Sequence, residues 1–354
     1  MKNKLTIAIL TALMTTSIAD AKPAEFASHH CKAAETNAQH YRNFPSALVE
    51  AQARHAKIKE VHAARAKLGT SSKDADSTTP YLPLVNGTPT YVIPVVFHVY
   101  GTVQGGDIVN DAVIIDALSK TNADFKGQTA DFADVDSEFE AVKDTLNIEF
   151  RLATIDPNGN PTSGIVYHPA SSGAGNYSSS DVVRDHWDNY KYMNVYIQND
   201  LYADGVTNNS GVAWYPDTAM SDAGLARVTY NGAYLGTNTD ENFRSVLTHE
   251  FGHFLDLIHT FEGGCKRGAV NRCSTTGDEI CDTPQQNSWQ MNPADGGIQN
   301  CLGKTINWQN FMAYSDQYAN YTQDQVDRMV NGLASGARNT LWSPNNLAAT
   351  GVAN

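Results

Sequence analysis

The chain has 354 residues, of which 41% are hydrophobic and 18% charged, and its formal net charge is −13. This composition supplies enough apolar side chains for a folded core and excludes a wholly disordered or fibrous protein. The acidic balance argues against nucleic acid as a partner, because a phosphate backbone calls for clustered positive charge. The length allows two domains, or one large domain with an appended segment.

The charge is divided unevenly along the chain. Residues 22–70 contain eight Lys and Arg against four Asp and Glu, a balance of +4. Residues 71–354 contain fifteen against thirty-three, a balance of −18. The two parts are therefore electrostatically opposite.

The first residues have the pattern of a secretory signal peptide. Lys2 and Lys4 form a basic start, residues 5–19 are mostly apolar, and Ala19 and Ala21 supply the small residues of a cleavage site. We expect cleavage after Ala21, which makes residues 1–21 a signal peptide and the protein secreted. A transmembrane anchor is the alternative, but this stretch is shorter than the roughly 20 residues that a span requires. No later run is apolar enough to form a membrane span.

Three further parts of the chain follow the signal peptide. Residues 22–85 are expected to be an appended segment and a linker. A helix is predicted over residues 45–68, but it has few large apolar residues and must rest on another part of the protein. The small and polar residues 69–80 are typical of a linker. Residues 86–340 then form the main domain, and residues 341–354 a C-terminal tail.

The main domain has the pattern of a mixed α/β (α+β) fold. β-Branched and aromatic residues predict a strand over residues 90–100, with Pro94 interrupting its ladder of hydrogen bonds. The spacing of apolar residues predicts a helix over residues 108–125. Further strands are predicted over residues 147–155, 192–198 and 225–230.

The segment from residue 242 to residue 261 carries the most specific chemistry. His249 and His253 are four residues apart, so on a helix both imidazoles project from one face and can bind one Zn²⁺. Glu250 lies beside the first histidine, placed to take a proton from a zinc-bound water. A chance occurrence on a surface helix is the alternative, and a third histidine, His259, in an exported chain argues against it.

His259 reaches the same metal only if the chain turns sharply after His253. Three imidazoles would then hold the ion and leave its fourth position to water, as catalytic zinc requires. Neutral ligands leave the charge of the ion uncompensated, which brings the pKa of the bound water towards ~7. The pattern therefore predicts a hydrolytic zinc centre.

These residues resemble the zinc-binding signature of the metzincin peptidases. The ending His259-Thr260-Phe261 resembles the pappalysin branch (cytophagalysin-like and ulilysin-like), and the similarity extends over most of residues 90–330, including the blocks at residues 95–99, 277–284 and 310–315. The resemblance implies a secreted zinc metalloendopeptidase, a hydrolase of internal bonds in protein or peptide substrates. It also implies that residues 86–340 are a metzincin-like catalytic domain with a twisted mixed sheet, an active-site helix and a C-terminal subdomain.

The resemblance also implies roles for two residues outside the zinc motif. Met312 would be the methionine of the Met-turn, an apolar base beneath the three histidines. Tyr314 would hydrogen-bond the tetrahedral intermediate, a role of the oxyanion type. Taken without the family, Met312 is an ordinary core methionine and Tyr314 a surface aromatic residue.

One position departs from the metzincin pattern. Asp256 stands where the family usually has glycine, in a turn that needs a positive φ. Aspartate tolerates that conformation, so we expect strain of about 1 kcal/mol rather than loss of the site. If its carboxylate faced the metal, it would change the set of ligands.

Two other functions fit part of the pattern. A gluzincin-type aminopeptidase would take a downstream glutamate as its third ligand, and His259 is better placed for that position. A secreted binding or adhesion module would have no use for the general base Glu250.

Four of the five cysteines lie between the zinc motif and Met312, and in an exported protein they are expected to form two disulfides. Their spacing permits three pairings and lacks the closely spaced pair of a zinc cluster. The pappalysin resemblance favours Cys265 with Cys281 and Cys273 with Cys301.

Cys31 remains, and it lies in the basic segment beside His29, His30 and Lys32, which could favour its thiolate. In a segment removed from a zinc peptidase, such a thiolate can occupy the open zinc position as a cysteine switch. Residues 22–85 are therefore predicted to include an inhibitory pro-segment of a latent zymogen. An unpaired or adventitiously paired thiol is the alternative.

Asp278, Glu279 and Asp282 form an acidic cluster of the kind that can hold Ca²⁺. Pappalysin-like peptidases are often stabilised by calcium, but the chain has no EF-hand spacing. A solvated acidic loop is therefore the favoured interpretation.

Overall fold

The computed structural model describes residues 31–68, 82–268, 272–289, 291–293, 297–315 and 317–353. The expected signal peptide lies outside these residues, as do His29, His30 and the expected linker at residues 69–80. Within the described residues, no helix combines the length and the apolar character needed to cross a membrane.

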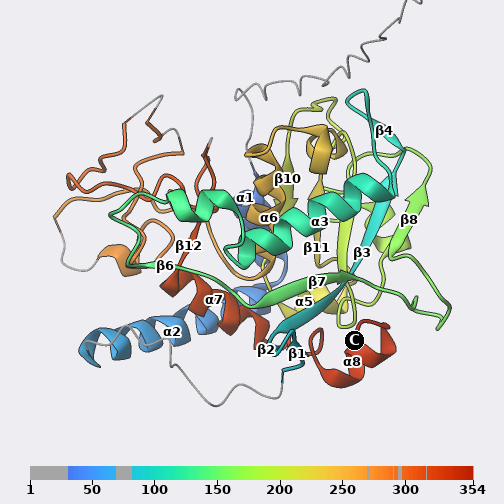
Figure 1. Ribbon diagram of the computed structural model, residues 1–354, viewed down its shortest axis with the longest axis horizontal. Coiled ribbons are helices and arrows are strands. Elements are labelled where there is room, and N and C mark those ends of the chain that lie inside the picture. The colour runs from blue at the N-terminus through green and yellow to red at the C-terminus, as the bar shows by residue number, and fades with distance from the viewer. Residues whose placement is uncertain are drawn as a thin grey trace, which may run out of the picture.

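A six-stranded twisted sheet forms the centre of the molecule (Figure 1). Five strands follow the order β10-β11-β9-β3-β7, and β8 pairs with the second half of β3. β10 is antiparallel to β11, and the other pairs are parallel. The strands are β3 (Tyr91–Tyr100), β7 (Ile148–Leu152), β8 (Ile165–His168), β9 (Met193–Ile197), β10 (Gly211–Ala213) and β11 (Arg227–Tyr230).

Pro94 does not interrupt the ladder of β3 as we expected. Pairing with β7 continues from Tyr91 through Pro94 to Val95. The bonds of Tyr91 N to Asn147 O and of Ala153 N to Val95 O show that odd-numbered residues face β7. Pro94 faces the other side, where pairing with β9 begins only at Val95, so its missing N–H leaves no partner unpaired.

The two faces of β3 pack against different elements. Val95 and Phe97 join the main core with residues of α3 (Asp111–Phe125) and α6 (Val246–Phe254). α3 begins later than the predicted residue 108, because Asn110 caps it by accepting a hydrogen bond from Val113 N. On the other face, Val92 packs with Leu347 of α8 (Pro344–Ala349). The expected C-terminal tail, residues 341–354, thus contains a helix that packs on the sheet.

The elements after Met312 also contribute residues to the main core, among them Tyr321, Met329 and Leu333. β12 (Tyr321–Thr322) pairs with β6 (Lys143–Asp144), and α7 (Gln323–Leu333) follows directly. A capping box of Thr322 and Gln325 fixes the start of α7. The remaining elements are β1 (Leu84–Val85), β2 (Thr88–Pro89), β4 (Val103–Gln104), β5 (Asp107–Ile108), α4 (Ser180–Asp185), α5 (Thr218–Asp222) and the 3-10 turns η2 (Ala130–Asp134), η3 (Gly232–Tyr234), η4 (Gly236–Asn238), η5 (Phe243–Ser245) and η6 (Arg272–Ser274).

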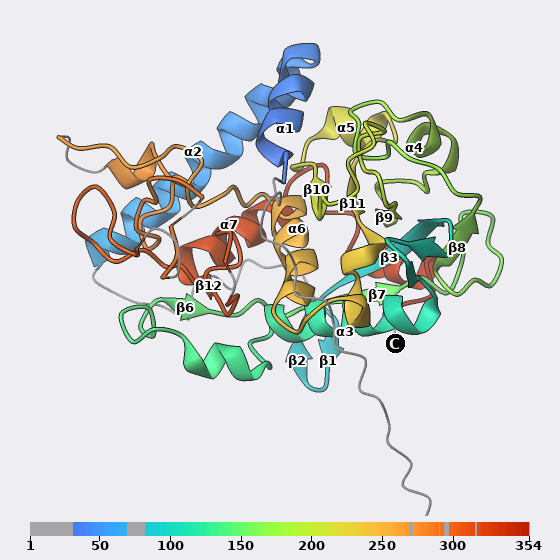
Figure 2. The same ribbon diagram turned by 90° about the horizontal axis from the view of Figure 1, so that it is seen from above.

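The basic N-terminal segment forms two helices that rest on this body, α1 (Ala33–Asn43) and α2 (Pro45–Leu68). α2 runs beside α7, and α1 stands over the end of α6 and β10 (Figure 2). Asn37 joins α1 to the edge of the sheet, because its Nδ2 donates to Ala213 O at 3.2 Å and its Oδ1 accepts from Tyr215 N at 3.0 Å.

Candidate active site

α6 places the first histidine pair of the motif in the interior. All nine of its residues are buried, since its apolar side chains pack into the main core. His249 and His253 lie one turn apart, and their Nε2 atoms are 3.0 Å from each other. The helix that we predicted around the motif is present.

The chain turns sharply after α6, as the third histidine requires. Asp256 has a φ of 86°, and Leu257 N donates back to Gly252 O at 3.0 Å. The turn brings His259 Nε2 to 3.1 Å from His253 Nε2. The Asp256 carboxylate is paired with Arg54 of α2, so the alternative in which it joins the ligand set is not what the structure shows.

The three imidazoles are oriented for a metal ion. Nδ1 of His249 contacts Phe311 O at 2.6 Å, Nδ1 of His253 contacts Leu257 O at 2.8 Å, and Nδ1 of His259 contacts Glu262 Oε2 at 3.0 Å. With Nδ1 engaged as donor, each ring presents an unprotonated Nε2 to the common point.

Electrostatics favour the same neutral form of the rings. Burial and the neighbouring His259 lower the pKa of His249 to about 3, and burial with both other rings lowers that of His253. This donor set fits zinc, which takes neutral imidazole nitrogens in catalytic sites.

Cys31 lies at the same point, on the segment that leads into α1. Its Sγ and the three histidines offer ligand atoms that all lie within 4.8 Å of one another. The Lys32 ammonium lies over the ring of Tyr202, 4.1 Å from the ring centroid, so it is not the partner of the thiolate that we expected. Burial and the charge of Glu250 raise the pKa of the Cys31 thiol, and a bound cation would act in the opposite direction.

Glu250 is fully buried beside the histidines, and burial raises its pKa to about 8. Its Oε2 lies 3.5 Å from Cys31 Sγ, whereas its Oε1 has no hydrogen-bond partner in the described part of the chain. A Cβ atom on Gly211 of β10 would lie 2.5 Å from that Oε1. Gly211 therefore makes room for the carboxylate, a role that we did not predict, although a lone glycine in a strand signals such a close approach.

Met312 is fully buried and lies against α6, the helix that carries His249 and His253. A Cβ atom on Gly252 of α6 would lie 2.7 Å from its sulfur, so this glycine lets the methionine pack directly under the helix. Met312 O also accepts a hydrogen bond from Thr260 N, at 3.2 Å, which ties it to the residue after His259.

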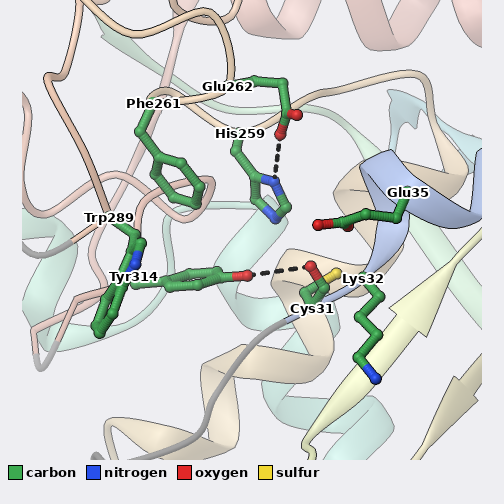
Figure 3. Close-up of a pocket in the computed structure, with 8 residues that line it drawn as sticks. All are labelled: Cys31, Lys32, Glu35, His259, Phe261, Glu262, Trp289 and Tyr314. Carbon is green, nitrogen blue, oxygen red and sulfur yellow. Dashed lines mark hydrogen bonds and ion pairs between the residues drawn. The ribbon is translucent and has the colours of Figure 1, made fainter. Parts of the chain in front are cut away.

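Tyr314 lies at the open side of the site, in a cavity of about 560 Å³ (Figure 3). Its ring centroid is 5.3 Å from that of His259, and its hydroxyl donates to Cys31 O at 3.2 Å. Lys32 and Glu35 line the same cavity. The N-terminal segment thus lies in the same cavity as Tyr314 and contacts its hydroxyl.

The disulfide pairing that we expected is wrong. The structure pairs Cys265 with Cys301 and Cys273 with Cys281, with Cα atoms 5.8 Å and 4.9 Å apart. The smaller loop is nested within the larger one. The path of the loop agrees with this pairing, because Arg267 Nε donates a hydrogen bond to Cys301 O. The chain that follows Cys265 therefore lies next to Cys301.

The acidic loop is not simply solvated. Asp278 is 1% exposed, and its carboxylate accepts hydrogen bonds from Thr283 and Gln325. Asp282 accepts from Thr322 Oγ1, and Glu279 pairs with Lys59 of α2. Within the described residues, these three carboxylates do not converge on one point, so calcium binding stays a prediction.

The fold and the three-histidine site define a zinc metallopeptidase of the metzincin class. Residues 176–334 match the model of peptidase family M43, described as pregnancy-associated plasma protein-A. An extracellular metalloprotease of Colletotrichum graminicola is 26% identical over 256 residues, which cover 68% of this chain and 75% of that protein. An extracellular metalloprotease of Verticillium alfalfae is 31% identical over 151 residues, 40% of this chain and 48% of that protein.

Solved structures of metallopeptidases have a similar fold. Mature mirolysin of Tannerella forsythia, in complex with a cleaved peptide, has a TM-score of 0.58 at 26% identity and covers 75% of this chain and 99% of that chain. A promirolysin mutant of Tannerella forsythia has a similar fold, with a TM-score of 0.61 at 24% identity over 90% of this chain and 97% of that chain. The chain is thus similar in sequence and in fold to metallopeptidases of the pappalysin family.

Proposed function

We propose that the protein is a secreted zinc endopeptidase made as a latent zymogen, with His249, His253 and His259 as its zinc ligands. The convergence of three imidazole Nε2 atoms with Cys31 Sγ, all within 4.8 Å, carries the proposal. Zinc, when bound, polarises the scissile carbonyl and lowers the pKa of a water molecule.

Glu250 then acts as the general base and acid. Its unpartnered Oε1 accepts the proton of the attacking water, and the same carboxyl group passes a proton to the leaving amine. Tyr314 Oη donates a hydrogen bond to the oxyanion, once its present acceptor, Cys31 O, has left. Met312 holds the histidines from below through its contact with α6.

The latent state is maintained by the N-terminal segment. Cys31 Sγ would supply the fourth ligand of the zinc ion, and the Cys31 carbonyl accepts the hydrogen bond of the Tyr314 hydroxyl, so both the water position and the oxyanion donor would be blocked. Export is supported by the extracellular metalloproteases that the chain resembles. Its substrates are proteins or peptides that can enter the cavity in extended form.

The base is tested by Glu250→Gln. Cleavage of unfolded casein should fall by about 10³-fold or more, because the amide cannot accept the proton. Zinc content by mass spectrometry of the native protein should stay at one ion per chain. Unchanged cleavage would rule out Glu250 as the base, and loss of zinc together with activity would show only damage to the site.

The switch is tested by Cys31→Ser in the full chain. The hydroxyl is a much poorer zinc ligand than a thiolate, so the precursor should cleave casein before any processing. The matched control is Ser46→Ala on α2, which should stay latent. A Cys31→Ser precursor that is as silent as its parent would contradict the switch.

A further inference from the structure

The carboxylate of Asp256 is held chiefly by Arg54 of the N-terminal segment, and His55 Nε2 lies farther away, 3.9 Å from its Oδ1. Arg54 of α2 donates from Nε to Asp256 Oδ2 at 3.3 Å and from Nη2 to Oδ1 at 3.0 Å. The two side chains are 8% and 2% exposed, so this bidentate pair is shielded from water. A guanidinium can match both carboxylate oxygens at once, which an ammonium cannot.

The surroundings of Asp256 form a socket rather than an open surface. Its backbone occupies the turn after α6, and a Cβ atom on Gly332 of α7 would lie 3.1 Å from Asp256 Cβ. The Asp256 side chain is 2% exposed, and both of its carboxylate oxygens face the guanidinium of Arg54. The carboxylate therefore lies in a buried site that α2 covers.

We propose that the Asp256 carboxylate forms the bottom of a binding site for an arginine side chain, and that Arg54 fills this site in the latent protein. The proposal rests on the proposed function, in which the segment containing α1 and α2 leaves the catalytic domain. It gives this segment two separate attachments, Cys31 at the histidines and Arg54 at the turn behind them. Removal of Arg54 would take away the only bidentate partner that the described residues give the buried Asp256 carboxylate, so this contact favours binding of the N-terminal segment.

The test uses the full chain with Glu250→Gln, which prevents self-cleavage, and measures hydrogen exchange of the α2 amides. Arg54→Gln and Arg54→Lys should each speed exchange about tenfold or more, because α2 opens more often. Lys57→Gln is the matched control, since Lys57 is an exposed cation on the same helix. Its exchange should equal that of the parent.

A thermodynamic cycle makes the assignment specific. Asp256→Asn should also loosen α2, and adding Arg54→Gln to it should change the exchange rate less than twofold, because the interaction is already lost. Fully additive effects, or an Arg54→Gln protein that exchanges like the Lys57→Gln control, would overturn the proposal. Circular dichroism and zinc content show that each variant is folded.

The two proposals fail in different ways. If Cys31→Ser stays latent while Arg54→Gln loosens α2, the cysteine switch is wrong and the arginine site stands. If Cys31→Ser is active while α2 exchanges normally in Arg54→Gln, the switch stands and the arginine site is wrong.

Discussion

At the scale of single residues, two glycines set how closely the functional side chains approach one another. A Cβ atom on Gly211 would lie 2.5 Å from Glu250 Oε1, and one on Gly252 would lie 2.7 Å from Met312 Sδ. Both distances are too short for a Cβ atom. Any residue other than glycine at position 211 or 252 would therefore displace the Glu250 carboxylate or the Met312 side chain. The position of the general base therefore depends on a residue that has no functional group.

Gly211→Ala should displace the Glu250 carboxylate and lower kcat about 10- to 100-fold, since small misplacements of a catalytic group are costly. Zinc content should not change, because the atoms nearest to a Cβ on Gly211 belong to Glu250 and not to a proposed zinc ligand. Gly336→Ala is the control, because its Cβ would meet only Thr218 Cγ2 at 3.4 Å. Equal activity of the two variants would contradict the role of Gly211.

The zinc motif could be predicted from the sequence because its spacing directly encodes positions on one helix. Gly211 and Arg54 could not, because each meets its partner only after distant segments fold together. Asp256 illustrates the limit. Its positive φ followed from its place in the motif, whereas its pairing with Arg54 depends on how α2 lies against α7.

At the scale of elements, β3 is the central strand and is buried on both faces, which explains its nearly continuous apolar sequence. It also carries one histidine in the interior. His98 Nδ1 lies 3.2 Å from His168 Nε2, and its Nε2 lies 3.1 Å from Asn194 Oδ1. Burial lowers the pKa of His98 from 6.5 to about 3, so this ring is neutral in the folded protein.

This histidine should make the protein sensitive to acid. The unfolded chain binds a proton at His98 below pH 6.5 and the folded one does not, so stability falls by about 1.4 kcal/mol per pH unit between pH 6.5 and 3. The free energy of unfolding of the Glu250→Gln chain, measured with urea, should fall between pH 7.5 and pH 5.0. This fall should be about 2 kcal/mol smaller when His98 is also changed to Gln.

The exposed His186 offers a matched control. His186→Gln should keep most of the pH dependence of the parent, because burial is the largest cause of the low pKa of His98 and the charge of His186 is the last of its causes. If His98→Gln also keeps it, other groups cause the acid sensitivity.

β3 was predictable from its run of β-branched and aromatic residues and α3 from the spacing of its apolar residues, whereas the helices α1 and α7 were not predicted. The short strands β8 and β10 were not predicted, since three or four residues carry too little pattern. The disulfide pairing was wrong because the path of a loop between cysteines is set by contacts such as that of Arg267 with Cys301, which spacing does not encode.

At the scale of the whole molecule, the opposite charges of the two parts meet at one interface. Lys59 Nζ lies 2.8 Å from Glu279 Oε2, and His62 Nε2 lies 3.6 Å from Asp324 Oδ1. These pairs are partly exposed, unlike the pair of Arg54 and Asp256, so salt should screen them more.

Raising NaCl from about 0.05 M to 0.5 M should therefore speed self-activation of the purified precursor several-fold, measured as the appearance of casein cleavage over time. Mature enzyme acting on an uncharged peptide serves as the control and should change little. A precursor whose activation rate is independent of salt would show that charge does not hold the segment in place.

The position of α2 beside α7 has a consequence for how activation depends on concentration (Figure 1). The contacts of Cys31 and Arg54 in the described residues lie outside the stretch between Leu68 and Leu82, so a protein cut there would keep the proposed inhibitory segment bound. The cut instead converts an intramolecular attachment into a bimolecular one, which loses the high effective concentration of a tethered segment. Dilution after secretion would then favour dissociation of the cut segment. The enzyme would therefore become active only at a distance from the cell that releases it.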